Sequence, residues 1–262
     1  MSANDPTQMT ALAQASSGAH PVPDRGHVNC YTSDPELQQL LALYLPTDLY
    51  KHLQPWFERM GELAGGAVDD WALEADRNPP TLEMRNRSGK EVQRIVKHPA
   101  YVEMEKVAFS QYGLAAMSHR AGVFGWDAAL PAAAKYALTY LFVQSEFGLC
   151  CPLSMTDSLT RTLRKYGDEK LVAKYLPKLL AMDFDSAVQG SMFMTEQAAG
   201  SDISNTLTMA YPQEDGSWRL YGEKWFCSNP DAGFGMVLAR VEGGPPGMKG
   251  ISLFLLPRQL DD

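Results

Sequence analysis

The apolar positions of the chain follow a helical period up to about residue 183 and an alternating, strand-like period after that point. From residue 33, leucine and aromatic side chains recur at spacings of three and four, and Ser33 or Asp34 with Pro35 provides a helix start. Residues 126–149 are apolar on nearly every face, which is typical of a helix in the middle of a bundle. The pattern predicts helices that begin near residues 33 and 47, and further helices over residues 100–118, 126–149, 155–166 and 168–181.

Proline and glycine interrupt the helical pattern at two places. Pro55 lies inside the second helical stretch and is expected to break or kink it, because its ring clashes with the preceding turn. Residues 75–99 contain Asn78-Pro79-Pro80 and Ser88-Gly89, so they predict a long loop that carries a short hairpin.

Alternation of apolar and polar residues predicts strands over residues 190–195, 205–212, 217–227, 235–241 and 250–256. The turn Glu214-Asp215-Gly216 and the glycine and proline run at 243–247 connect two pairs of these strands as hairpins. The predicted fold class is therefore α+β, with an amino-terminal all-helical bundle domain followed by an incomplete antiparallel β-barrel-like domain.

The change of period also predicts how the chain is divided. Residues 1–29 are rich in Ala, Ser, Thr, Gln and Pro, and we expect them to form a mobile arm. We place the helical domain at residues 30–187 and the middle β domain at residues 188–262. A sheet that ends on the strand at 250–256 has a long exposed edge, which natural proteins normally pair or cover.

Composition and charge exclude several classes of function. The net charge of −8 and the isoelectric point of about 5.2 argue against non-specific nucleic-acid binding, which needs clustered Lys and Arg. No apolar run approaches the roughly 18 residues of a membrane span, and no signal peptide is indicated. The 4 cysteines are irregularly spaced, so they predict no disulfide framework and fit a reducing cytoplasm.

Three kinds of catalytic or cofactor site are not indicated. The 5 histidines show no ligand spacing, so we expect no metal site. The Gly-x-Ser-x-Gly motif of many hydrolases does not occur. The pairs Gly65-Gly66 and Gly243-Gly244 lack the strand, glycine loop and helix of a Rossmann nucleotide site.

Residues 191–203 are the most informative segment of the chain. A short apolar run ends at Thr195-Glu196 and enters a loop of small residues, where the amides of Gly200-Ser201 can approach a phosphate or a carbonyl closely. A second strand-like run ends in Phe226 and Ser228. Both strand ends are therefore expected to border one flat ligand.

Residues 191–203 and 224–229 resemble the two flavin-contacting segments of the acyl-CoA dehydrogenase family. The family patterns are roughly Tyr-x-Val-Thr-Glu-x-x-x-Gly-Ser-Asp and Lys-x-Trp-Ile-Thr-Asn; here Met192 replaces the usual aromatic residue and Phe226 the usual Trp. The resemblance sharpens towards the alkylation-response (AidB-like) branch, whose flavin strand also reads Lys-Trp-Phe-x-Ser. It spans most of residues 30–257 through further matching segments, which are Asn78-Pro79-Pro80, His98-Pro99-Ala100, residues 151–156 and Ser204-Asn205-Thr206.

This resemblance implies a bound FAD. It implies that Thr195 hydrogen-bonds the edge of the isoalloxazine ring, that Phe226 stacks on the ring, and that Ser228 bonds near N5 or the ribityl chain. Ser201 matches a residue that contacts the pyrophosphate or the substrate thioester, so it is also the implied substrate-binding residue. The implied cofactor-binding residues are Met192, Met194, Thr195, Gly200, Ser201, Phe226, Cys227 and Ser228.

The resemblance also implies an oxidoreductase that carries out α,β-dehydrogenation of an acyl-CoA thioester. In the family, a Glu of a carboxy-terminal helical domain takes the α proton while the flavin accepts the β hydride. No residue of this chain matches that Glu, so no catalytic residue is assigned here, and Glu196 is expected to be structural. The sequence is therefore expected to be the amino-terminal portion of a longer flavoprotein, without the family's carboxy-terminal helical bundle.

Alternative functions and partners follow from the same resemblance. A protein of the alkylation branch keeps the flavin fold but protects DNA or detoxifies alkylating agents, and its DNA-binding surface is ascribed to the carboxy-terminal domain. A third hypothesis is an inactive folded fragment. For the full-length protein the family implies a cytoplasmic homotetramer, a dimer of dimers, that binds acyl-CoA or a related small molecule and no membrane.

Overall fold

The computed structural model describes residues 27–260, so most of the arm predicted at residues 1–29 lies outside the described residues. The helices are α2 Pro35–Tyr44, α3 Thr47–Ala64, α4 Ala67–Arg77, α5 Pro99–Glu105, the π-helix η1 Lys106–Gln111, η2 Val123–Gly125, α6 Ala132–Phe142, α7 Cys150–Tyr166, α8 Glu169–Leu179, η3 Ile203–Asn205 and η4 Gly247–Gly250. The strands are β1 Thr81–Arg85, β2 Glu91–Val96, β3 Gly190–Phe193, β4 Met209–Pro212, β5 Trp218–Tyr221, β6 Phe234–Val241 and β7 Ile251–Pro257.

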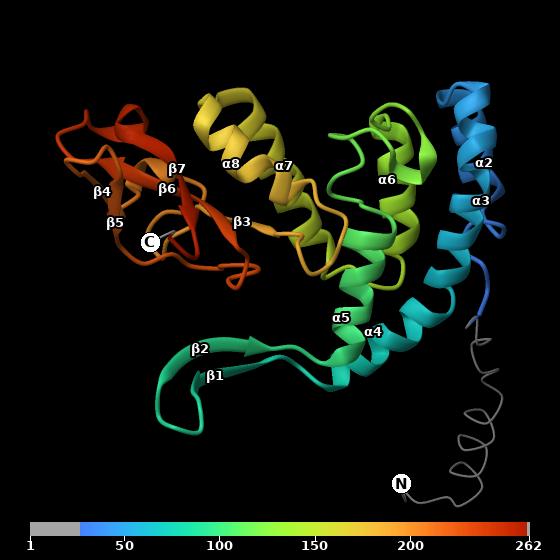
Figure 1. The fold of residues 1–262 in the computed structure, drawn as a ribbon, viewed down its shortest axis with the longest axis horizontal. Helices are drawn as coiled ribbons and strands as arrows, with labels where there is room; N and C mark the ends of the chain where they lie inside the picture. The colour runs from blue at the N-terminus through green and yellow to red at the C-terminus, as the bar shows by residue number, and fades with distance from the viewer. Residues whose placement is uncertain (1–26, 261–262) are drawn as a thin grey trace, which may run out of the picture.

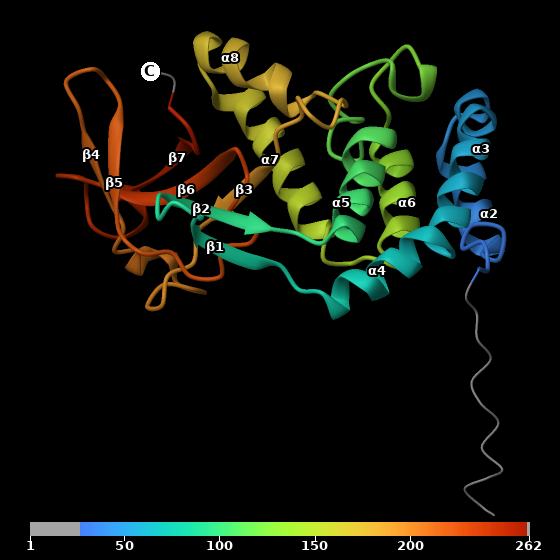
Figure 2. The same cartoon turned by 60° about the horizontal axis from the view of Figure 1, so that its bottom comes forward.

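Helices and sheet occupy opposite ends of the molecule (Figure 1). The β1–β2 hairpin extends from the helical end towards the sheet, as a second view also shows (Figure 2). Arg258, just after β7, donates a hydrogen bond to the carbonyl of Gln93 in β2 at 3.4 Å.

The α+β fold class and the order of helices before strands are confirmed. The domain limits at 30–187 and 188–262 remain a prediction, and the long connection between α8 and β3 contains the proposed boundary.

Capping explains two helix starts that the sequence predicts. Asp34 accepts a hydrogen bond from Leu37 N at 2.8 Å at the start of α2, and Asp168 accepts one from Leu171 N at 2.8 Å at the start of α8. Pro55 was expected to break or kink its helix; α3 continues through it, so no break occurs. Fully buried apolar side chains flank this proline in α3, and their packing outweighs the backbone hydrogen bond that a proline removes.

The single helix predicted over residues 126–149 is wrong. Helix α6 begins after Pro131, and a turn separates it from α7, which begins at Cys150. In that turn Glu146 accepts a hydrogen bond from Leu149 N at 3.0 Å. Buried turns can be as apolar as buried helices, so the apolar pattern alone did not reveal the interruption.

The sheet has the order β3-β6-β4-β5, with β7 on the other edge of β6. The hairpin pairs β4–β5 and β6–β7 are antiparallel, as the turn residues predict. The prediction of a purely antiparallel sheet is wrong, because β3 and β4 both run parallel to β6. Short turns determine the pairing of consecutive strands, whereas these parallel pairs join strands that are distant in the sequence.

Strand β3 lies directly on α7. Thr156 of α7 accepts a hydrogen bond from Gly190 N at 2.9 Å and donates one to Pro152 O at 2.7 Å. A Cβ added at Gly190 would lie 3.1 Å from Thr156 Cα, so a larger residue would separate the strand from the helix. The contact at Gly190 therefore fixes the start of β3 against α7. A second contact joins the sheet to the helices: Tyr175 of α8 and Phe234 of β6 pack edge to face with ring centroids 4.9 Å apart.

Across residues 27–260, no helix combines the length and the apolar character that crossing a membrane requires.

A buried ion cluster joins the helices around Asp157 of α7. Its carboxylate contacts His119 Nε2 at 2.6 Å and Lys135 Nζ at 2.8 Å, and all three side chains are buried. Arg161, which is largely exposed, lies 3.5 Å from the same carboxylate. Burial by itself raises the pKa of Asp157, but hydrogen bonds and charge from His119 and Lys135 outweigh it and lower this pKa to about 2.

We predict that Asp157→Asn lowers the free energy of unfolding by about 3 to 5 kcal/mol, because it leaves the buried Lys135 ammonium without its counter-charge. Because the folded-state pKa of Asp157 lies below its ordinary 3.8, its contribution is present above pH 3.8 and is lost as the pH falls towards 2. The variant should therefore lose less stability than the wild type over this acidic range. Urea unfolding at a series of pH values measures both effects.

The matched control is Arg161→Gln, which removes the exposed partner of the same carboxylate. We expect it to change the free energy of unfolding by less than about 1 kcal/mol. Equal losses in the two variants would contradict the assignment of the stabilisation to the buried contacts.

Candidate flavin site at the end of strand β3

The two segments predicted to border one ligand lie side by side. Trp225 N donates a hydrogen bond to Thr195 O at 2.8 Å, and Lys224 Nζ donates one to Met194 O at 3.1 Å. Further along, Asn229 Nδ2 donates to Gly190 O at 3.3 Å. The segment at 224–229 therefore follows the backbone of β3 and its extension.

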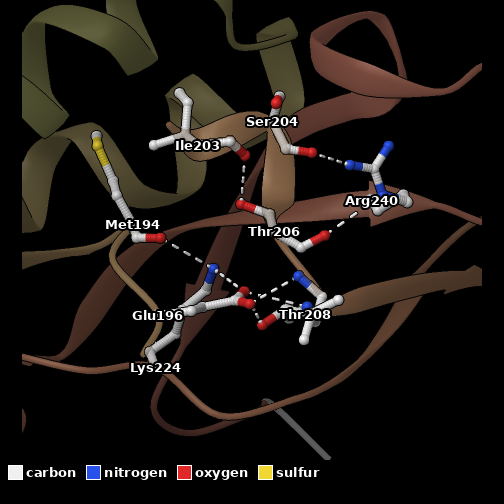
Figure 3. Close-up of polar contacts among 9 residues, drawn as sticks. Met194, Glu196, Ile203, Ser204, Thr206, Thr208, Lys224 and Arg240 are labelled. Carbon is white, nitrogen blue, oxygen red and sulfur yellow. Dashed lines mark hydrogen bonds and ion pairs between the residues drawn. The ribbon is translucent and has the colours of Figure 1, made fainter. Parts of the chain in front are cut away.

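Glu196 is the centre of the polar contacts in this region (Figure 3). Its carboxylate accepts hydrogen bonds from Leu207 N at 2.6 Å and from Thr208 N at 3.0 Å. It also accepts from Thr208 Oγ1 at 2.6 Å and from Lys224 Nζ at 2.7 Å. The Lys224 ammonium in turn contacts Met194 O, so one buried ion pair connects three segments of the chain.

The environment of Glu196 makes it a structural residue. Burial by itself raises its pKa, but the hydrogen bonds from Lys224 and Thr208 outweigh burial and lower this pKa to about 2. A carboxylate that is 6% exposed and stays ionised so far below neutral pH is a poor general base. The contacts agree with the structural role expected for Glu196 from the sequence.

The small-residue loop after Glu196 presents an open face. Gly200, Ser201 and Asp202 are exposed. Asp202 caps the short helix η3 by accepting a hydrogen bond from Ser204 N at 3.0 Å. A Cβ added at Gly200 would meet no atom within 4 Å, so the space beside this loop is free for a ligand. The approach of this loop to a phosphate stays a prediction.

Phe226 is presented to solvent in an unusual backbone conformation. Its side chain is 82% exposed, and its φ is 55°, in the left-handed region that side-chain-bearing residues rarely adopt. Asn229, three positions later, has φ 54°. Phe226 is therefore not part of the hydrophobic core. Strained backbone of this kind concentrates at ligand sites, where it aims a side chain at a ligand.

The remaining predicted residues take different positions. Ser228 is exposed, and its N–H donates to Phe226 O at 3.0 Å. Cys227 is half-buried, and burial raises the pKa of its thiol. Met192 is half-buried and packs against the apolar cluster between α7, α8 and β6. Met194 is half-buried and contributes the carbonyl that Lys224 binds.

A cavity of about 330 Å³ opens beside Ser228, between the helices, the β1–β2 hairpin and the loop after Asn229. Its lining includes Tyr101, Cys151 and Pro152. Lys97 lines it as well and forms ion pairs with Glu105 at 2.9 Å and with Asp231 at 3.2 Å. Sequence reasoning missed this cavity because its walls come from segments far apart in the chain.

His98 lies at the start of helix α5. Its Nδ1 accepts a hydrogen bond from Ala100 N at 3.3 Å, so it caps α5 as a helix-entry residue. Within residues 27–260, no three His, Cys, Asp or Glu side chains gather closely enough to hold a metal ion.

Two family profiles match the chain. The profile described as "Adaptive response protein AidB N-terminal domain" matches residues 21–186, and "Acyl-CoA dehydrogenase, middle domain" matches residues 191–262. The first match covers the helices from α2 to α8, and the second covers the five-stranded sheet. The chain belongs to the acyl-CoA dehydrogenase family, in its AidB-like branch.

Individual relatives agree with this assignment. The chain is 28% identical to acyl-CoA dehydrogenase family member 11 of Caenorhabditis elegans over 236 residues, which are 87% of this chain and 38% of that protein. It is 31% identical to the putative acyl-CoA dehydrogenase AidB of Escherichia coli K12 over 199 residues, 72% of this chain and 34% of that protein. The chain therefore spans little more than a third of these relatives.

Solved structures resemble the fold over most of its length. The apo form of Bd2924 superposes with a TM-score of 0.81 at 34% identity, covering 91% of this chain and 48% of that one. Caenorhabditis elegans ACDH-11 in complex with C11-CoA superposes with a TM-score of 0.79 at 26% identity, covering 98% and 44%.

We predict that Phe226→Asn leaves the free energy of unfolding unchanged or raises it by up to about 1 kcal/mol, because Asn tolerates the left-handed conformation and the Phe ring is 82% exposed. Phe226→Val is expected to lower it by about 1 kcal/mol or more, because β-branched residues fit that conformation poorly. Urea unfolding of both variants tests the strain. Equal destabilisation by the two substitutions would show that the ring, and not the backbone, determines the stability.

Proposed function

We propose that this protein binds FAD non-covalently and takes part in the α,β-dehydrogenation of an acyl-CoA thioester. The hydrogen bond between Trp225 N and Thr195 O carries the proposal, because it joins the two segments that the sequence assigns to one flat ligand. The exposed ring of Phe226 lies next to this bond in the chain. Membership of the acyl-CoA dehydrogenase family supports the same cofactor.

Each predicted residue has a role in this proposal. Thr195 and Ser228 would hydrogen-bond the isoalloxazine ring, and Phe226 would stack on it. Gly200 and Ser201 would receive the pyrophosphate, which the open space beside Gly200 accommodates. FAD, when bound, supplies the hydride acceptor of the reaction. We assign no residue of this chain to removal of the α proton.

The substrate is an acyl-CoA or a related small molecule in this proposal. Ser201 is the proposed thioester or pyrophosphate contact. We place the acyl chain in the cavity of about 330 Å³ beside Ser228, whose walls include the apolar surfaces of Tyr101 and Pro152. The likeness to ACDH-11, a structure in complex with C11-CoA, supports this class of substrate.

The test is a titration with FAD followed by flavin fluorescence. The double variant Thr195→Val with Ser201→Ala removes two hydrogen-bonding hydroxyls, which should cost about 2 to 6 kcal/mol of binding free energy, or about 30-fold or more in Kd. Thr32→Val with Ser88→Ala removes two exposed hydroxyls elsewhere and should leave Kd unchanged. Equal affinity of the two double variants would overturn the assignment.

The alkylation-response function is a second candidate. The match of residues 21–186 to the AidB N-terminal domain favours it. We propose that any DNA contact of such a protein lies outside this chain, whose net charge is −8. A gel-shift assay with methylated duplex DNA is therefore expected to show no binding by this chain at physiological salt. Salt-sensitive binding would contradict this proposal and favour direct protection of DNA.

A dimer of dimers in the cytoplasm completes the proposal. Apolar side chains of the β1–β2 hairpin support self-association, because Leu82 is 60% exposed and Met84 is 51% exposed. The 4 free cysteines support a reducing compartment. Light scattering after gel filtration measures the oligomeric state directly.

A further inference from the structure

The loop at 200–206 is held by a side chain that the sequence does not single out. Arg240 lies near the end of β6 and is half-buried. Its guanidinium donates hydrogen bonds to three backbone carbonyls, Ser204 O at 2.6 Å, Thr206 O at 3.3 Å and Gly247 O at 3.1 Å. Figure 3 shows the guanidinium directed at the first two of these carbonyls. Charge-assisted hydrogen bonds of this kind are about twice as strong as neutral ones.

Arg240 and Glu196 hold the loop at different points. Before the loop, Glu196 N and Ala199 O form a backbone hydrogen bond of 2.9 Å. After the loop, the Glu196 carboxylate binds the N–H groups of Leu207 and Thr208, and Arg240 N donates to Thr208 O at 2.8 Å. The guanidinium of Arg240 then holds the second half of the segment through the carbonyls of Ser204 and Thr206, three and five positions after the exposed residue Ser201.

The chemistry of this contact favours arginine over other residues. A guanidinium carries five N–H donors in a rigid plane, so it can hold several carbonyls in one geometry, whereas an ammonium on a flexible stem cannot reproduce that fork. A loop that is already ordered loses less conformational entropy when a ligand binds. The residues that support a binding site therefore affect affinity without touching the ligand.

We propose that Arg240 is a positioning residue for the cofactor, which fixes the 200–206 loop so that Ser201 is held ready for the pyrophosphate. This inference rests on the proposed function, in which the loop receives FAD. It assigns Arg240 no contact with FAD and no part in the chemical step. The role is exerted through the carbonyls of Ser204 and Thr206.

The experiment compares wild type, Arg240→Gln, Arg240→Lys and the control Arg219→Gln, which changes an exposed arginine of β5 in the same sheet. For each protein we measure the FAD Kd, the melting temperature without FAD, and hydrogen exchange of residues 200–207. We expect Arg240→Gln to raise Kd at least 10-fold and to speed exchange in this segment. Arg240→Lys should lie between Arg240→Gln and wild type, and Arg219→Gln should match wild type.

Two results would overturn the inference while leaving the proposed function intact: wild-type Kd in a folded Arg240→Gln, or a raised Kd with unchanged exchange of residues 200–207. If Arg240→Gln does not fold, Arg240→Lys is the variant that tests the inference. A wild-type FAD Kd together with wild-type hydrogen exchange in Arg240→Lys would then overturn it. Failure of the wild type to bind FAD would instead refute the proposed function and with it the inference.

Discussion

The buried carboxylate of Glu196 is the interaction on which the candidate site depends. It binds the Lys224 ammonium and the backbone of residues 207–208, so it fixes the end of β3, the start of β4 and the segment that presents Phe226. Arrangements that leave the buried Glu196 carboxylate without these partners are disfavoured, because each unpaired charge in the interior would cost several kcal/mol. One ion pair therefore selects one arrangement of three segments that are remote in sequence.

A second polar network attaches this site to the helices. Asn229 binds Gln189 Oε1 at 3.0 Å, and Gln189 binds Glu105 Oε1 at 2.8 Å. Lys97 bridges Glu105 and Asp231, so the loop that follows Phe226 is connected to α5 through hydrogen bonds and charge. The segment that follows Phe226 and the cavity beside Ser228 are therefore both attached to α5 through the same polar contacts.

The sequence predicted the parts of the fold that short-range rules determine. Asp34 and Asp168 marked helix starts, and turn residues marked the β4–β5 and β6–β7 hairpins. The strand predicted over residues 217–227 stops at Tyr221, and the flavin contacts of Thr195 and of the segment at 224–229 stay a prediction. The parallel pairing of β3 and β4 with β6 was missed, because it depends on contacts between distant segments. Arg240 was missed for the same reason, since its acceptors are backbone carbonyls, which leave no residue pattern.

The most direct test of the account is hydrogen exchange of the wild-type chain with and without FAD. If both segments contact one flavin, FAD should slow exchange at residues 195–202 and at residues 225–229 together, because both segments would lose access to water and mobility. Protection of only one segment, or of neither at saturating FAD, would contradict the claim that the segments joined by Trp225 and Thr195 form a single flavin site.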